Sequence, residues 1–270
     1  MLRVLERHEF KIKAMAGTSA GGLIGAVYLS GYSPDEIQDI LENVDQDELF
    51  KRSDDAQPSL LGLEGMHKLL IELIGDRKFD DLKIPFAVTA VDLKNGKPLV
   101  IKSGRVVDAV LATIAIPGVF PAKEMDGKLL VDGAIYNPVP VNVVRSLAPK
   151  LPVVAVPLSF MPKEEEILPE TEFFEESPIL KRITRFRFAQ ALTVFLRSQD
   201  ISGRLLTELR LQIDKPDVII RPDVFGVGVL DKVKVADIVK FGEEAAELEL
   251  DNLIKAVRWD NRLKKLIGLN

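Results

Sequence analysis

The segment FKIKAMAGTSAGGLIGAVYL, residues 10–29, decides the fold. Residues 10–16 alternate between apolar and polar side chains and then become fully apolar, which predicts a buried β-strand. Residues 23–29 are apolar on every side, which is typical of a central helix. A short glycine-rich turn, residues 17–22, connects the two. A buried strand that leads through a tight turn into a buried helix is expected in an α/β domain.

The rest of the chain alternates between helices and strands. Ser33-Pro34-Asp35-Glu36 predicts a capped helix start, and the dipeptides Asn95-Gly96 and Asp126-Gly127 predict β-hairpins. Helices are predicted at 2–9, 34–44, 60–74, 106–115, 179–213 and 235–259, a loop at 45–59, and strands at 10–16, 84–92, 98–102, 123–125, 128–131, 151–158 and 218–221. This order predicts a single domain over residues 1–270, a three-layer α/β/α fold with a mainly parallel central sheet.

Composition excludes several classes of protein. The 36 Lys and Arg against 41 Asp and Glu give a net charge of -5, so no nucleic-acid partner is expected. The absence of cysteine excludes disulfides, thiolate metal sites and cysteine nucleophiles, and two histidines are too few for a histidine-rich metal site. We therefore expect no metal and no cofactor. Because no targeting segment and no apolar run of membrane-spanning length is found, we expect a cytoplasmic protein.

The glycine-rich turn contains a nucleophile motif. Gly17-Thr18-Ser19-Ala20-Gly21 fits G-x-S-x-G, with the strand before it and the helix after it that this motif requires. A sharp turn exposes the serine oxygen, and the free N–H groups at the helix N-terminus favour a developing oxyanion. The alternative is that Ser19 only caps the helix.

A nucleophilic serine needs a base. His8 and His67 both lie early in the chain, whereas the usual chain order of α/β-hydrolases places the histidine last, after the acid. The candidate base is instead Asp132, which with Gly133 and Ala134 follows the strand at 128–131, where a strand end favours an active-site residue. Two alternatives remain: the Asp-Gly pair is only a turn, or His67 completes a Ser-His-Asp triad.

Four blocks in order resemble the patatin-like phospholipase family. They are residues 17–22, residues 88–96, residues 115–121 followed by Asp132-Gly133-Ala134, and residues 216–223. The resemblance implies a serine acyl hydrolase that acts on lipid or phospholipid esters through a Ser19–Asp132 dyad without histidine. It also implies contact with a lipid substrate, which allows a peripheral position at the inner membrane face.

The resemblance also predicts a difference from the family at the beginning of the chain. Family members carry a strand and a glycine-rich loop ahead of the helix with which this sequence begins, and that loop supplies oxyanion donors. We therefore expect an N-terminally incomplete domain in which the Ala20 N–H is the one donor identified. A strand at 10–16 would then lie at a sheet edge, and Leu2, Leu5 and Ile12 would be uncovered. A catalytically impaired lipid-binding protein is the alternative function.

One charged stretch stands out. Residues 164–176 contain seven acidic side chains, and Lys181, Arg182, Arg185 and Arg187 follow them. A solvated loop before an ordinary helix explains this pattern, and the alternative is a lid with a basic face for anionic headgroups.

Overall fold

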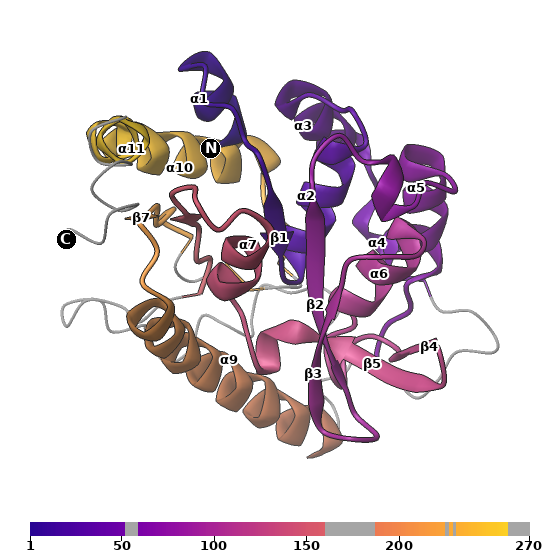
Figure 1. Ribbon diagram of the computed structural model, residues 1–270. Helices are drawn as coiled ribbons and strands as arrows, with labels where there is room; N and C mark the ends of the chain where they lie inside the picture. The colour runs from indigo at the N-terminus through magenta and orange to yellow at the C-terminus, as the bar shows by residue number, and fades with distance from the viewer. Residues whose placement is uncertain (52–58, 160–186, 225–226, 229–230, 259–270) are drawn as a thin grey trace.

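The structure, a computed structural model, describes residues 1–51, 59–159, 187–224, 227–228 and 231–258. The acidic stretch at 164–176 lies outside the described residues. Helices lie on both sides of a central sheet, with α2 to α6 on one side and α7, α9, α10 and α11 on the other (Figure 1). The predicted three-layer α/β/α arrangement is therefore confirmed.

Strand β2 (Phe86–Asp92) is the centre of the sheet, and all seven of its residues are buried. The other strands of this sheet are β1 (Met15–Gly17), β3 (Lys97–Ile101), β4 (Lys123–Met125) and β5 (Lys128–Asp132). Strand β3 runs along one edge of β2, since it pairs with every residue from Val88 to Asp92. Strands β1 and β5 share the opposite edge, because Val88 also pairs with Gly17 and Ala90 also pairs with Asp132.

The sheet is mixed, so the prediction of a mainly parallel sheet is only partly confirmed. Strand β1 is parallel to β2, and β6 (Val154–Ala155) is parallel to β7 (Val218–Ile219) in a separate pair. The pairs β2–β3, β2–β5 and β4–β5 are antiparallel. Two of these follow from the tight turns at Asn95-Gly96 and Asp126-Gly127, because a chain that reverses within a few residues must return antiparallel to itself.

The helices agree with the sequence prediction at most positions. Their bounds are α1 Leu2–Arg7, α2 Ala20–Leu29, α3 Pro34–Asn43, α4 Gln46–Leu49, α5 Glu64–Ile74, η1 Phe79–Asp81, α6 Val106–Thr113, η2 Gly133–Ile135, α7 Val141–Leu147, α9 Arg187–Asp214, α10 Val235–Leu248 and α11 Leu250–Val257. The Ser33 hydroxyl accepts the Glu36 amide and the Glu36 carboxylate accepts the Ser33 amide, so the predicted capping box is formed.

Several boundaries differ from the prediction. The loop expected at 45–59 contains the short helix α4, whose first turn is capped by the Asp45 carboxylate. The last helix divides at Glu249 into α10 and α11. The strand expected at 10–16 is paired only from Met15, because the preceding residues have no neighbouring strand in the described part of the chain.

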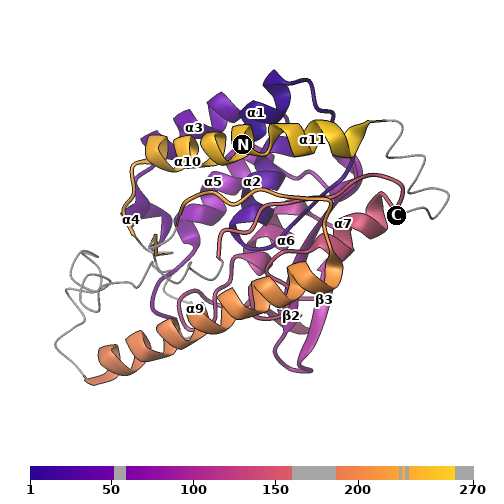
Figure 2. The same ribbon diagram turned by 90° about the vertical axis from the view of Figure 1, so that its left-hand side faces the viewer.

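Side chains far apart in the sequence share the core. The largest cluster joins α2, α5, α6 and β2, and includes Leu70, Val88 and Val110. A second cluster packs Val4 and Leu5 of α1 against α10 and α11, which lie beside α1 in Figures 1 and 2. The expectation that Leu5 is uncovered is therefore wrong, since the C-terminal helices cover it. A third cluster joins α7, β6 and the C-terminal part of α9.

None of the described helices combines the length and the apolar character needed to cross a lipid bilayer.

Candidate active site

Ser19 lies in a strained backbone conformation between β1 and α2. Its φ of 53° and ψ of -124° place a residue with a Cβ in a region that side chains disfavour. The side chain is partly exposed. Such strain is characteristic of the sharp strand-to-helix turn that presents a serine nucleophile.

Gly17 makes this turn sterically possible. A Cβ on Gly17 would lie 2.4 Å from the backbone of Gly21 and Gly22, which no folded backbone tolerates. Gly21 is different, since a Cβ there meets no atom within 4 Å. The two glycines of the motif thus have unequal roles, and the motif alone does not distinguish them.

Buried threonines hold the turn in place. The Ser19 amide donates to Thr113 Oγ1 at 3.0 Å, and the Thr113 hydroxyl donates to the Thr89 carbonyl at 2.7 Å. Beneath them, the Thr18 hydroxyl donates to the Asn137 carbonyl at 2.8 Å. Thr18 Oγ1 and Thr89 Oγ1 are 2.6 Å apart. Because the Thr18 proton is already committed to a carbonyl, Thr89 is the donor of that bond.

Sequence reasoning missed the roles of Thr89, Thr113 and Asn137. The signal that could have found them is a polar residue within an apolar run, such as Thr89 in FAVTAVD, since buried polar groups need partners. The identity of the partners depends on the fold and is not local.

Asp132 is the last residue of β5 and is 2% exposed. Its amide donates to the Ala115 carbonyl at 2.9 Å, and its Oδ1 accepts the Ala134 amide at 2.8 Å, which caps η2. A Cβ on Gly133 would lie 2.1 Å from Thr89 Oγ1, so this turn also requires glycine. Asp132 reaches the site on a strand that is antiparallel to β2.

The sheet register brings the two turns together. Strands β1 and β5 run toward each other along the same edge of β2, and they end opposite Val88 and Ala90. Only Thr89 separates these two positions. The Ser19 hydroxyl consequently lies near enough to the Asp132 carboxyl to lower its pKa.

Burial sets the protonation of Asp132. Desolvation raises the pKa of its carboxyl from 3.8 to about 6, and the Ser19 hydroxyl and the Ala134 amide partly oppose this rise. A carboxylate with a pKa of about 6 is mostly ionised at neutral pH and is a stronger base than an exposed aspartate.

The Ala20 amide is available to a ligand. In the described part of the chain, no acceptor takes its hydrogen, whereas the next amides, Gly21 and Gly22, bond to Thr18 and Ser19 carbonyls. Ala20 is exposed at the N-terminus of α2, where the helix dipole favours negative charge.

Neither histidine lies at this site. His67 is exposed on α5, and His8 contacts Glu247 at 3.3 Å beyond the end of α1. The described residues contain no group of three or more carboxylate or histidine side chains suited to a metal ion.

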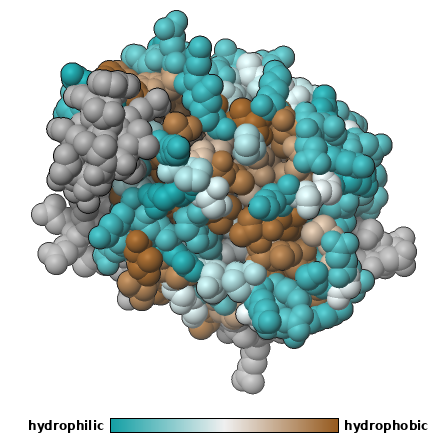
Figure 3. All heavy atoms as spheres, viewed as in Figure 1, coloured by the Kyte–Doolittle hydropathy of each residue, from teal (hydrophilic) through white to brown (hydrophobic). Residues whose placement is uncertain are grey.

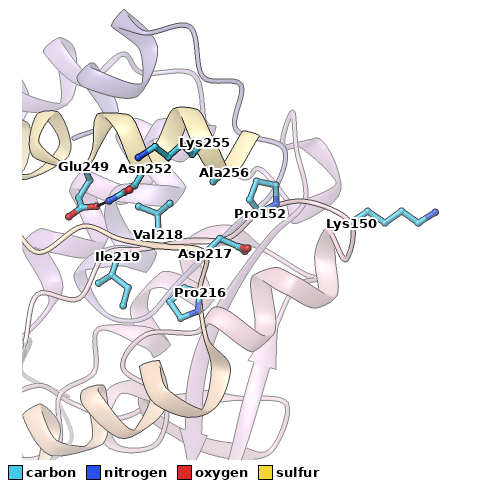
Figure 4. Close-up of a pocket in the computed structure, with 10 residues that line it drawn as sticks. All are labelled: Lys150, Pro152, Pro216, Asp217, Val218, Ile219, Glu249, Asn252, Lys255 and Ala256. Atoms are coloured by element: carbon cyan, nitrogen blue, oxygen red, sulfur yellow. Dashed lines mark hydrogen bonds between the residues drawn. The ribbon is translucent and has the colours of Figure 1, made fainter. Parts of the chain in front are cut away.

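A cavity of about 560 Å³ lies elsewhere, below α11 at the start of β6 and β7 (Figure 4). Lys150 and Lys255 line it together with Asp217 and Glu249, and Asn252 donates to Glu249 across one wall. Neither Ser19 nor Asp132 lines this cavity. Because both acidic and basic side chains line it, its charge does not indicate one class of ligand.

Comparison with known proteins gives a consistent picture. A family model described as patatin-like phospholipase matches residues 1–145. An uncharacterized NTE family protein of Mycobacterium tuberculosis is 29% identical over 149 residues, 54% of this chain and 41% of the relative. The uncharacterized protein YqhO of Bacillus subtilis is 31% identical over 195 residues, 60% of this chain and 66% of YqhO. Patatin-like phospholipase domain-containing protein 7 of Rattus norvegicus is 26% identical over 163 residues, 58% of this chain and 12% of the relative. The chain thus spans less than half the length of the mycobacterial relative.

Proposed function

This chain belongs to the patatin-like phospholipase family, whose members hydrolyse lipid esters in general, and from that membership we propose a serine acyl hydrolase with a Ser19–Asp132 dyad. One observation carries the proposal. The Ser19 hydroxyl, on a strained turn, lies near enough to the buried Asp132 carboxyl to affect its pKa of about 6, and His8 and His67 are both exposed elsewhere.

In the first step, Ser19 Oγ attacks the ester carbonyl carbon while its proton passes to Asp132. The carbonyl oxygen becomes an oxyanion, which the Ala20 amide and the positive end of α2 stabilise. The tetrahedral intermediate then collapses. The C–O bond to the alcohol breaks, and Asp132 returns the proton to that alcohol, which leaves Ser19 acylated.

In the second step, water attacks the acyl carbon and gives its proton to Asp132. Collapse of the second tetrahedral intermediate releases the fatty acid and returns the proton to Ser19 Oγ. No histidine is needed, since burial alone raises the basicity of Asp132 into the useful range.

The test uses p-nitrophenyl butyrate with wild type, Ser19→Ala, Asp132→Asn and the double variant. Both single variants should lose activity, and the double variant should lose no more than either, because the residues act as a unit. Ser30→Ala is a matched control, since Ser30 ends the same helix and its hydroxyl donates to the Ala26 carbonyl. Equal turnover in wild type and Ser19→Ala would overturn the proposal.

A lipid-binding protein with an impaired site is the competing function. It is favoured by the single oxyanion donor, Ala20, that we identify among the described residues. Loss of one such donor typically lowers kcat by about 100- to 1,000-fold. A fluorophosphonate probe separates the two functions, because it labels Ser19 only if the serine is activated. Labelling of wild type but not of Ser19→Ala favours the enzyme, and no labelling favours the binding protein.

We also propose that residues 1–270 form one patatin-like domain, although the family model ends at residue 145. Helix α1 packs against α10 and α11, and α9 packs against α7, so the C-terminal helices complete clusters that the N-terminal half begins. A cytoplasmic location with peripheral membrane contact remains a prediction.

A further inference from the structure

Helix α9 carries an unusual row of exposed apolar side chains. Figures 1 and 2 show the helix along the outside of the domain, and apolar side chains are visible over its C-terminal part at the lower left of Figure 3. Their exposed fractions range from 41% to 69%. We call this set the α9 stripe, and it consists of Val194, Phe195, Ile201, Leu205, Leu209 and Ile213.

The stripe is uncharged, and the polar residues that share its side of the helix are Ser198, Ser202 and Gln212. At 100° per residue, its members fall within an arc of about 120° around the helix. The charged residues between 194 and 213 all lie outside this arc. On the opposite side, Thr207 and Leu211 are buried, and Leu211 packs in the cluster of α7 and β6. The helix is therefore attached to the domain by one face and presents an apolar face outward, the reverse of an ordinary surface helix.

The stripe adjoins the proposed catalytic centre. Helix α9 contacts η2, the turn that begins directly after Asp132. The Arg210 guanidinium donates to the Tyr136 carbonyl at 3.1 Å and covers the Tyr136 ring at 4.8 Å from its centroid. Ile135, in η2, and Tyr136, directly after it, are themselves exposed apolar side chains on this side of Asp132.

We propose that the α9 stripe, with Ile135 and Tyr136, docks the protein on a lipid surface and so positions the site beside its substrate. This inference rests on the proposed lipid-ester hydrolysis. An exposed apolar surface of this size marks an interaction site, and a single helix with an apolar outer face suits the boundary between headgroups and acyl chains.

Area and charge favour a lipid surface over a second copy of the chain. With about 150–200 Å² for a large whole side chain, six half-exposed ones present roughly 500 Å². A stable dimer buries about 800 Å² on each partner. Beside the stripe, Arg204 pairs with Asp200, Glu208 pairs with Arg221, and the Arg210 guanidinium is held at Tyr136, so headgroup charge should contribute little.

The test measures co-sedimentation with phosphatidylcholine vesicles. All proteins carry Ser19→Ala, so that binding is read without hydrolysis. Leu205→Ser with Leu209→Ser should lower the partition coefficient by about 10- to 100-fold, since each loses apolar surface that lipid would cover. Leu248→Ser is the control, because Leu248 is 84% exposed on α10, away from the stripe, and its loss should leave binding unchanged. Replacing 30% of the lipid by phosphatidylglycerol should change binding little.

Activity separates this inference from the proposed function. With Ser19 restored, the double leucine variant should keep its turnover of soluble p-nitrophenyl butyrate and lose turnover of vesicle lipid. If the protein with both leucines bound vesicles no better than the double leucine variant, the proposed docking surface would be wrong. That result would not bear on the Ser19–Asp132 dyad. A dimer that the same two substitutions dissociate, in analytical ultracentrifugation without lipid, would assign the stripe to a second copy and also overturn the inference.

Discussion

Replacing Asp132 by asparagine should stabilise the protein at neutral pH while it abolishes turnover. The carboxyl is 2% exposed, and burial raises its pKa from 3.8 to about 6. Between pH 3.8 and about pH 6, the Asp132 carboxyl therefore keeps its proton in the folded state but loses it in the unfolded chain. It follows that stability is undiminished below about pH 4 and falls as the pH rises through 6.

The magnitude follows from the shift. A pKa raised by about 2 units corresponds to about 3 kcal/mol, at about 1.36 kcal/mol per unit. Asparagine has the same shape, stays neutral, and keeps an oxygen that can accept the Ala134 amide. The difference in unfolding free energy between Asp132→Asn and wild type should therefore reach about 3 kcal/mol at pH 8, and about 1.4 kcal/mol of it should develop between pH 5 and pH 8. If the new amide also changes the unfolding free energy by an amount that does not depend on pH, that amount cancels when the difference is compared between two pH values.

The assay is urea unfolding followed by circular dichroism at pH 5, 6, 7 and 8. Asp92→Asn is the matched control, since Asp92 is also buried at the end of a strand of the same sheet. The Asn95 amide lowers the pKa of Asp92, so that both the folded and the unfolded states are ionised above pH 5. Its difference from wild type should be independent of pH over this range.

A difference for Asp132→Asn that also stays constant from pH 5 to pH 8 would refute the reasoning. It would mean that the folded carboxylate is solvated, and burial could then not be the origin of its basicity.

Three further results are expected. Gly17→Ala should lower the unfolding free energy by about 2–4 kcal/mol in urea titrations, because its Cβ would collide with backbone, whereas Gly21→Ala should be neutral or slightly stabilising. Thr113→Val should lower kcat about 10-fold with little change in KM, because the Ser19 amide loses the acceptor that holds the turn, and Thr113→Ser should restore it. In wild type, kcat/KM should rise with pH through about 6 and then level off, as Asp132 of the free enzyme loses its proton. A profile that does not rise through this range would argue against a carboxylate base.

The structure shows which features local sequence could predict. The hairpins at Asn95-Gly96 and Asp126-Gly127 were predictable because their turn type is set by the residues in the turn. The capping box at Ser33 is equally local. The extent of the strand at 10–16 was not predictable, since pairing depends on whether another strand lies alongside. The division of the last helix at Glu249 was also not predictable, because neither glycine nor proline lies at this position.

Part of the candidate site could likewise be predicted from the local sequence, and part depends on tertiary packing. The glycine pattern around Ser19 indicates a strained turn, and the missing late histidine indicates a carboxylate base, both from the sequence alone. Their catalytic roles remain predictions. The hydroxyl network could not be predicted, because the partners of Thr113 are set by the packing of α6 on β2.

The position of Thr89 explains why two distant motifs form one site. Strands β1 and β5 approach from opposite ends along one edge of β2, and Thr89 occupies the gap between them. Its hydroxyl donates to Thr18 beside the nucleophile turn and fills the space that a Cβ on Gly133 would need. Both turns therefore rest on the same side chain. The two turns are consequently held one residue apart along β2, the most deeply buried strand, and this register is what brings Ser19 and Asp132 to the same part of the molecule.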